Sequence, residues 1–199
     1  MAWIDIISPL NAEGNLKKYY ERIVGPDGQV DNILQVHSLR PHTLAGHMSA
    51  YKNILHHSGN TLPKWFMEVL GVYVSILNQC NYCTSHHFEG LKRLLGDDRQ
   101  ADKIRAALEA NRPVQVLEEK ELEAIKYAEK LTTSPGMISS NDAKKLQKAG
   151  YSDGEILEIN QVVSYFNYAN RTVSGLGVNT KGDALGLSPN GDDENWNHQ

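Results

Sequence analysis

Apolar residues recur along most of the chain at the three- and four-residue spacing that places them on one face of an α-helix, whereas strand-like alternation is nearly absent. This pattern predicts an all-α fold with short connections, because Gly, Pro and Ser residues separate the periodic segments. Ser152 and Glu155 form the sequence pattern of a capping box at the start of the last segment. The expected helices cover residues 13–24, 41–57, 62–79, 80–95, 98–110, 117–131, 139–149 and 152–174.

The length and composition indicate one domain. A chain of 199 residues with 40% hydrophobic residues can bury a single core, and we expect residues 1–187 to form one helical domain. From Ser188 onward the sequence is polar, and Trp196 is its single large apolar residue. Residues 188–199 are therefore expected to be a disordered tail or to pack on another subunit.

The charge and hydropathy of the chain indicate which classes of protein it does not resemble. The net charge is −4, and Lys and Arg are interspersed with Asp and Glu, which argues against a nucleic-acid-binding protein. Residues 1–20 lack the pattern of a secretory signal. The longest segment without a charged residue, 69–88, is polar in its second half and does not read as a membrane span. We therefore expect a soluble cytoplasmic protein.

Both cysteines lie three positions apart, in the segment 78–87 (NQCNYCTSHH). Because cytoplasmic thiols are kept reduced, a close pair is typical of a catalytic or metal-binding site rather than of a structural disulfide. If the segment is helical, Cys80, Cys83 and His87 share one stripe, which continues with leucines and therefore faces the interior. His86 falls on another face, so the spacing selects His87 as the neighbour of the cysteines.

The helix expected at 62–79 is apolar on nearly every side but carries Glu68, whose buried carboxylate needs a partner. Gly71 and Ser75 are small enough to let another helix approach closely. A helix hairpin would bring Glu68 back toward His87. In that arrangement His87 can accept the proton of Cys83, Glu68 can orient the imidazole, and Cys80 can condense with an oxidised Cys83.

Two other interpretations of the cysteines were weighed. They could be two small core residues, or they could join His87 and Glu68 in a zinc site. Neither a second cysteine pair nor a His pair at zinc-finger spacing follows, which favours the redox dithiol over zinc.

The four residues Glu68, Cys80, Cys83 and His87 form the pattern E-x11-C-x-x-C-x-x-x-H, which resembles the alkylhydroperoxidase D (AhpD) family of the carboxymuconolactone decarboxylase-like superfamily. The flanking segments SLRPHTLAGHMSAY and FNYANRTVSGLGV resemble its peroxidase-related branch. The resemblance implies an AhpD-like fold with the C-x-x-C motif at the N-terminal end of a core helix. It also implies a homo-oligomer, trimer-based or hexameric, with thiol peroxidase activity that needs no metal, haem or other cofactor.

In that family the second cysteine reacts with the peroxide, which maps to Cys83, with Cys80 as its resolving partner and Glu68 and His87 as a proton relay. One departure is Tyr82, which stands where well-studied members have a histidine, so the relay role of this position is in doubt. The implied partners are a small hydroperoxide and a dithiol reductant. A dithiol–disulfide oxidoreductase and a non-catalytic sensor of oxidative stress stay open as alternatives.

The remaining polar and aromatic residues were assigned structural roles. We expect solvated positions for His56, His57 and His86, and a position at the core edge or surface for His47. Asparagines of the last helix are expected to bond to other helices or subunits, and the aromatic residues at 165–168 to lie in the core or an interface. Together with the all-round apolar helix at 62–79, these aromatic residues predict a surface that a second subunit covers.

Overall fold

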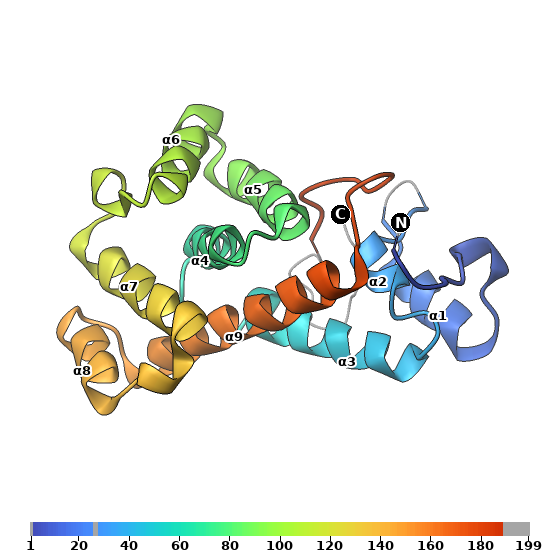
Figure 1. Cartoon of the computed structure of the whole chain (residues 1–199), viewed down its shortest axis with the longest axis horizontal. Helices are drawn as coiled ribbons and strands as arrows, with labels where there is room; N and C mark the ends of the chain where they lie inside the picture. Colours follow the sequence, from blue (N-terminus) through green and yellow to red (C-terminus); the bar gives the residue numbers. More distant parts are fainter. Residues whose placement is uncertain (1, 26–27, 189–199) are drawn as a thin grey trace.

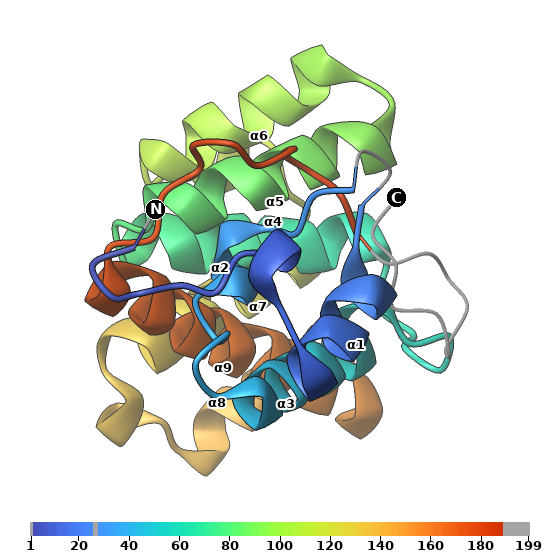
Figure 2. The same cartoon turned by 90° about the vertical axis from the view of Figure 1, so that its right-hand side faces the viewer.

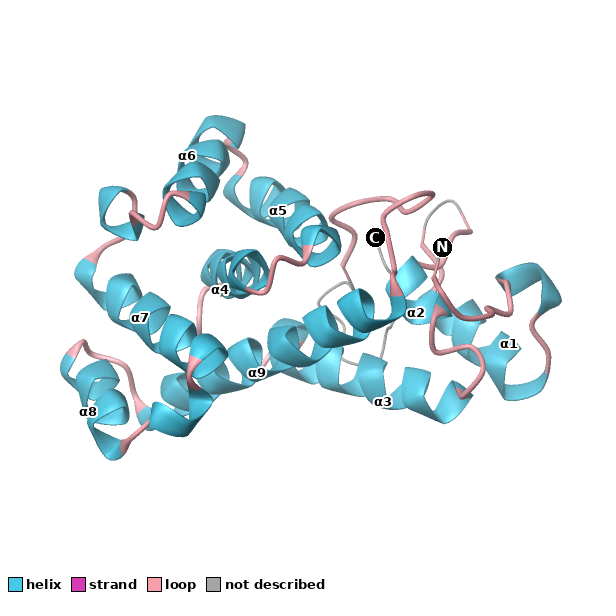
Figure 3. Cartoon of the chain, in the orientation of Figure 1, coloured by secondary structure: helices cyan, strands magenta, loops and turns pink. Residues whose placement is uncertain are grey.

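The computed structural model describes residues 2–25 and 28–188, and every regular element in these two ranges is helical (Figures 1 and 3). The α-helices are α1 (Gly14–Ile23), α2 (Asn32–Gln35), α3 (Pro41–Tyr51), α4 (Lys64–Leu77), α5 (Asn81–Leu95), α6 (Asp98–Glu109), α7 (Glu119–Thr133), α8 (Ser140–Lys148) and α9 (Asp153–Leu176). The predicted all-α class is confirmed. The tail prediction for 188–199 falls, after its first residue, outside the described residues.

The boundaries of the helices follow local signals. Helix α9 begins with the predicted capping box, in which the Ser152 hydroxyl accepts the Glu155 N–H at 3.2 Å and the Glu155 carboxylate accepts the Ser152 N–H at 2.7 Å. Helix α3 continues into one π-helical turn, Lys52–His56, so the predicted segment 41–57 is one continuous rod with a changed pitch. The sequence pattern missed α2, because four residues are too few to show a helical period.

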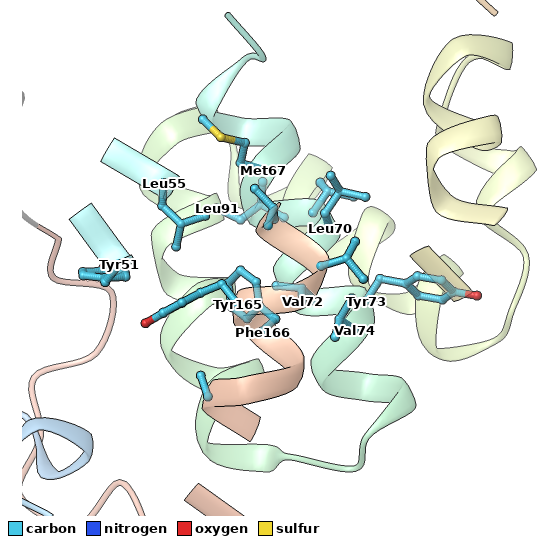
Figure 4. Packing of buried hydrophobic residues seen from close by; sticks show 14 of the residues in the cluster. Tyr51, Leu55, Met67, Leu70, Val72, Tyr73, Val74, Leu91, Tyr165 and Phe166 are labelled. Carbon is cyan, nitrogen blue, oxygen red and sulfur yellow. The ribbon is translucent and has the colours of Figure 1, made fainter. Parts of the chain in front are cut away.

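Helix α4 forms the centre of the molecule, and α5, α7 and α9 pack around it (Figures 1 and 2). All ten residues from Phe66 to Ser75 are buried. Tyr165 and Phe166 of α9 are buried too, and Figure 4 shows them against the side chains of α4. The chain therefore covers these parts of α4 and α9 itself, whereas Tyr168 is 44% exposed. The second subunit stays a prediction.

The predicted close approach of a helix to Gly71 and Ser75 is confirmed, and the helix is α9. A Cβ atom on Gly71 would lie 2.1 Å from Cζ of Phe166, which is closer than two non-bonded carbon atoms can approach. One turn later, the Asn170 amide donates to the Ser75 hydroxyl at 3.0 Å. The small residues of α4 thus set how deeply α9 sits against it.

We expect Gly71→Ala to lower the free energy of unfolding by about 1–3 kcal/mol or more, because the added methyl group forces Phe166 and α9 away from α4. Gly175→Ala is the matched control, since this helical glycine has no heavy atom within 4 Å of the added position. It should leave stability unchanged or raise it by up to about 1 kcal/mol. Urea denaturation measures both, and equal stability of the two variants would contradict the packing argument.

Within the described ranges, no helix combines the length and the apolar character needed to cross a bilayer.

Candidate active site

A tight turn between α4 and α5 places the two cysteines. Gln79 adopts a left-handed conformation with φ of 56°, which reverses the chain after α4. The Cys80 N–H then donates to the Ser75 carbonyl at 2.9 Å. Cys80 is the N-cap residue of α5, and Cys83 lies in its first turn. The predicted position of the C-x-x-C motif, at the N-terminal end of a core helix, agrees with this geometry.

Asparagines of α9 hold this turn. The Asn78 amide donates to the side-chain oxygens of Asn167 at 3.0 Å and Asn170 at 2.9 Å. Asn170 is 1% exposed and also forms a hydrogen bond with the Cys83 side chain. Asn170 therefore has a structural role, as expected, and is also a direct neighbour of a candidate catalytic sulfur.

The two sulfurs share a hydrogen bond, and their surroundings differ. Both cysteines are buried and reduced. The hydrogen bond from the Cys83 thiol, with further bonds from the Cys83 N–H and the Ser174 hydroxyl, lowers the pKa of Cys80 to about 6. The same shared bond, together with burial and the nearby Cys80 sulfur, raises the pKa of Cys83 well above its ordinary value. This order of acidity is the reverse of the expected one, which placed the resting thiolate on Cys83.

This acidity predicts a pH dependence for alkylation by iodoacetamide. Above a pH of about 6, Cys80 is a thiolate and its alkylation rate should be constant; below that pH the rate should fall about tenfold per unit, because the thiol does not react. Cys83→Ala removes the main hydrogen-bond donor and should move the inflection toward the ordinary value of about 8.5. Peptide mass mapping identifies the labelled thiol. An inflection near 8.5 in the unmodified protein would contradict this assignment.

Glu68 and His87 are paired, as the hairpin predicted. Glu68 Oε2 accepts a hydrogen bond from His87 Nδ1 at 2.7 Å, and both side chains are largely buried. The Phe166 ring and the imidazole pack edge to face, with the ring centroids 4.5 Å apart. With Nδ1 committed to the carboxylate, Nε2 is the nitrogen of His87 that can exchange a proton with a substrate.

These groups meet at a small cavity, called the inner cavity below, of about 40 Å³. Cys83, Glu68 and His87 line one part of its wall. A water-sized group needs at least about 10–15 Å³, so the inner cavity has space for only a few such groups.

Aromatic residues of α3 and α9 complete the inner cavity, which sequence reasoning did not foresee. His47, Tyr51 and Tyr165 all line it, and the Tyr165 hydroxyl lies 3.4 Å from His47 Nε2. Burial raises the pKa of Tyr51 and of Tyr165 well above their ordinary values, with a further contribution to Tyr165 from Cys83. Both hydroxyls are therefore neutral hydrogen-bond donors. Their helical spacing placed these residues in the core, but no sequence pattern showed that they face Cys83.

The expectation of solvated His56 and His86 was wrong, since both are buried. The chain after α9, residues 178–188, crosses the face of α5 (red in Figure 2) and covers His86. His86 Nε2 lies 3.2 Å from Asp183 Oδ2 in this segment. No helical period marks an irregular segment, so this cover was invisible in the sequence pattern.

Tyr82, which stands where the family has a histidine, belongs to the same contact. Its hydroxyl donates to Asp183 Oδ2 at 2.7 Å and accepts the Ile33 N–H at 3.1 Å. Burial and the charge of Asp183 raise the pKa of Tyr82 well above its ordinary value. Tyr82 thus ties α5 to α2 and to the segment 178–188.

The zinc alternative finds no support in the arrangement of side chains. In the described part of the chain, no group of three or more His, Cys, Asp or Glu residues is placed to hold a metal ion.

No family model matches, and no curated protein matches. Solved structures do match. An uncharacterized peroxidase-related protein from Silicibacter sp. TM1040 shares 25% identity over 88% of this chain and 90% of its own, with a TM-score of 0.73. A peroxidase-related protein with an AhpD core from Ralstonia eutropha JMP134 shares 18% identity over 89% of this chain and 91% of its own, with a TM-score of 0.76.

The chain has the AhpD-like fold of the peroxidase-related proteins. The resemblance read from the sequence is thereby confirmed. The AhpD-like fold also occurs in the debrominase Bmp8, which was solved as a cysteine-to-alanine variant in complex with 2,3,4-tribromopyrrole. That structure shares 15% identity over 88% of this chain and 91% of its own, with a TM-score of 0.66. The AhpD-like fold therefore supports more than one activity.

Proposed function

We propose that this protein is a thiol-dependent peroxidase that reduces a small hydroperoxide with the Cys83–Cys80 dithiol. One observation carries the proposal: Cys83 lines the inner cavity together with the Glu68–His87 pair, and Cys80 is hydrogen-bonded to it from outside the cavity. Nucleophile, proton donor and resolving thiol thus lie within one or two helical turns of each other.

The reaction has two chemical steps. The Cys83 thiolate attacks one oxygen of the hydroperoxide, the O–O bond breaks, and the other oxygen takes a proton and leaves as an alcohol or water. Cys83 is then a sulfenic acid. The Cys80 sulfur attacks Cys83, a disulfide forms, and the hydroxyl group leaves as water with one proton. The two electrons come from the two thiols, so the proposed reaction uses no cofactor or metal.

The acidities of the two thiols support the following path for the protons. The resting pair holds its thiolate on Cys80 and its proton on Cys83. As Cys83 attacks, its proton passes to Cys80 along their shared hydrogen bond. His87, supported by the carboxylate of Glu68, donates a proton to the departing oxygen, and the neutral hydroxyl of Tyr165 offers that oxygen a further hydrogen bond.

The size of the inner cavity supports a small substrate, such as hydrogen peroxide or a short alkyl hydroperoxide. The other partners stay as proposed from the sequence: a dithiol reductant, no nucleic acid and no membrane, in the cytoplasm. We also propose the homo-oligomer, trimer-based or hexameric. Light scattering tests it, and a monomer mass of about 22 kDa at micromolar concentration would overturn it.

Peroxide turnover tests the function. With dithiothreitol in excess, we expect many equivalents of peroxide to be consumed per protein, and without it one equivalent and a loss of about two hydrogens from the intact mass. A sensor of oxidation would form the disulfide without rapid turnover. A dithiol–disulfide oxidoreductase would reduce disulfide substrates and ignore peroxide. Two thiols that stay fully alkylatable after peroxide treatment would overturn the proposal.

A further inference from the structure

A second concave surface, called the outer hollow below, lies on the other side of the cysteine pair. Its volume is about 300 Å³, against about 40 Å³ for the inner cavity. Cys80 lines the outer hollow and Cys83 does not, whereas Cys83 lines the inner cavity and Cys80 does not. Tyr82 lines both and stands between them. The two sulfurs of one dithiol therefore face two separate spaces.

The hydrogen-bond partners of the two sulfurs agree with the finding that each sulfur faces a different space. Cys83 bonds to Asn170, which is 1% exposed. Cys80 bonds to the hydroxyl of Ser174, an exposed residue of the outer hollow. The Cys80 sulfur thus lies just beneath the protein surface, although the residue itself is only 2% exposed.

Apart from the Cys80 sulfur, which is neutral in the disulfide that the reductant meets, the lining of the outer hollow is uncharged. Its polar side chains, all from described residues, are neutral amides, hydroxyls and one phenol, and Asn81 and Ser85 come from the first turns of α5. The indole of Trp3 covers Gly177 at the rim and is itself 79% exposed. By contrast, the inner cavity includes the carboxylates of Asp31 and Glu68. A neutral, partly apolar molecule fits the outer hollow best.

We propose that the outer hollow admits the reductant, a slim thiol that is uncharged near its sulfur, and that this thiol attacks Cys80. The inference rests on the proposed function, because it concerns the disulfide left after peroxide reduction. The inner cavity is too small for a thiol of several heavy atoms, and the recessed position of Cys80 favours a narrow molecule or arm over a flat protein surface.

The exchange balances as follows. The reductant thiol loses its proton and attacks the Cys80 sulfur, the Cys80–Cys83 bond breaks, and Cys83 leaves as a thiolate that takes up a proton from solvent and becomes the resting thiol. Cys80 then carries a mixed disulfide. A second thiolate attacks the reductant sulfur of this mixed disulfide, which releases Cys80 as a thiolate and the reductant as its own disulfide. Peroxide and reductant thus approach from opposite sides, and neither has to leave before the other can enter.

A charge-swap experiment tests the route. The disulfide form is prepared with diamide, so the test stays independent of any reaction with peroxide. Its reduction is timed with 2-mercaptoethanol, which is neutral, and with 2-mercaptoethanesulfonate, which is an anion. Asn81→Lys should raise the ratio of the anionic to the neutral rate about threefold at low salt, Asn81→Asp should lower it similarly, and both effects should shrink at high salt.

Asn141 supplies the matched control, since it is an exposed asparagine in the first turn of α8 and does not line the outer hollow. Asn141→Lys and Asn141→Asp should leave the ratio unchanged. Asn81→Trp should slow reduction by both thiols about tenfold and leave the oxidation of the reduced protein by peroxide unchanged, whereas Asn141→Trp should alter neither. If the ratio of the two rates does not change with the charge at residue 81, or if the mixed disulfide maps to Cys83, the proposal is overturned.

Discussion

Cys83→Ser should abolish peroxide turnover, because it removes the sulfur that lines the inner cavity beside His87. Removal of a covalent nucleophile lowers the rate by at least about a thousandfold in enzymes where it has been measured. Peroxide consumption with dithiothreitol measures the loss. The side chains differ by one atom, so a thermal melt should show an intact fold.

Cys80→Ser should also lose peroxide turnover, but at a later step of the reaction than Cys83→Ser. Cys83 can still attack the peroxide, but no second thiol can resolve the product, so a sulfenic acid should accumulate at Cys83 and react with dimedone. The low pKa of Cys80 places the resting thiolate on the proposed resolving cysteine, so the two variants are needed to tell which sulfur attacks the peroxide. If Cys80 is itself the nucleophile, the sulfenic acid will form in Cys83→Ser and the roles are reversed. Equal residual activity in both variants would remove the dithiol from the mechanism.

Glu68→Gln should lower kcat/KM for peroxide about a hundredfold, because general acid catalysis contributes about 10²–10⁴ and the variant removes the charge that supports a protonated His87. The amide keeps the shape of the side chain and can still bond to the imidazole. Alkylation of Cys80 at neutral pH should change little, since its acidity comes mainly from Cys83 and Ser174. A loss of turnover with unchanged alkylation separates proton transfer from a general disturbance of the site.

Two controls sharpen this test. Glu89→Gln changes a carboxylate of the same region, whose side chain is 41% exposed and paired with Lys92, and should leave turnover unchanged. His87→Gln should cost about as much as Glu68→Gln, and the double variant little more than either, because the two residues act as one unit. Additive losses would show that Glu68 acts independently of His87 and would contradict the relay.

Much of the site was predictable because its four residues are related by local geometry. The 3.6-residue period puts Cys83 and His87 on one face of α5, and a short turn after α4 brings Glu68 back along the neighbouring helix. The cost of burying a carboxylate pointed to a partner for Glu68, and the structure supplies it at 2.7 Å. Capping of α9 is local in the same sense, whereas the small residues Gly71 and Ser75 predicted a close approach without identifying α9 as the helix that makes it.

The expectations that the structure corrected concern residues far apart in the chain. His47 and Tyr165 are 118 positions apart and meet because the π-helical turn that continues α3 packs against α4 and α9. His86 seemed solvated because its cover, Asp183, lies 97 positions away in a segment without periodicity. The helical period of α4 shows that its faces are buried, but not that other helices of the same chain bury them.

The longer helices, the hairpin of α4 and α5, and the group of Glu68, Cys80, Cys83 and His87 could be predicted from the sequence, because periodicity, capping and the cost of a buried charge act over one or two turns. Which sulfur is the stronger acid, and which space each sulfur faces, became clear only from the packed structure. The order of acidity depends first on the hydrogen bond that the two sulfurs share and on the burial of Cys83, with a smaller contribution from Ser174 of α9 to the low pKa of Cys80. The space that each sulfur faces depends on how α9 packs against the turn between α4 and α5.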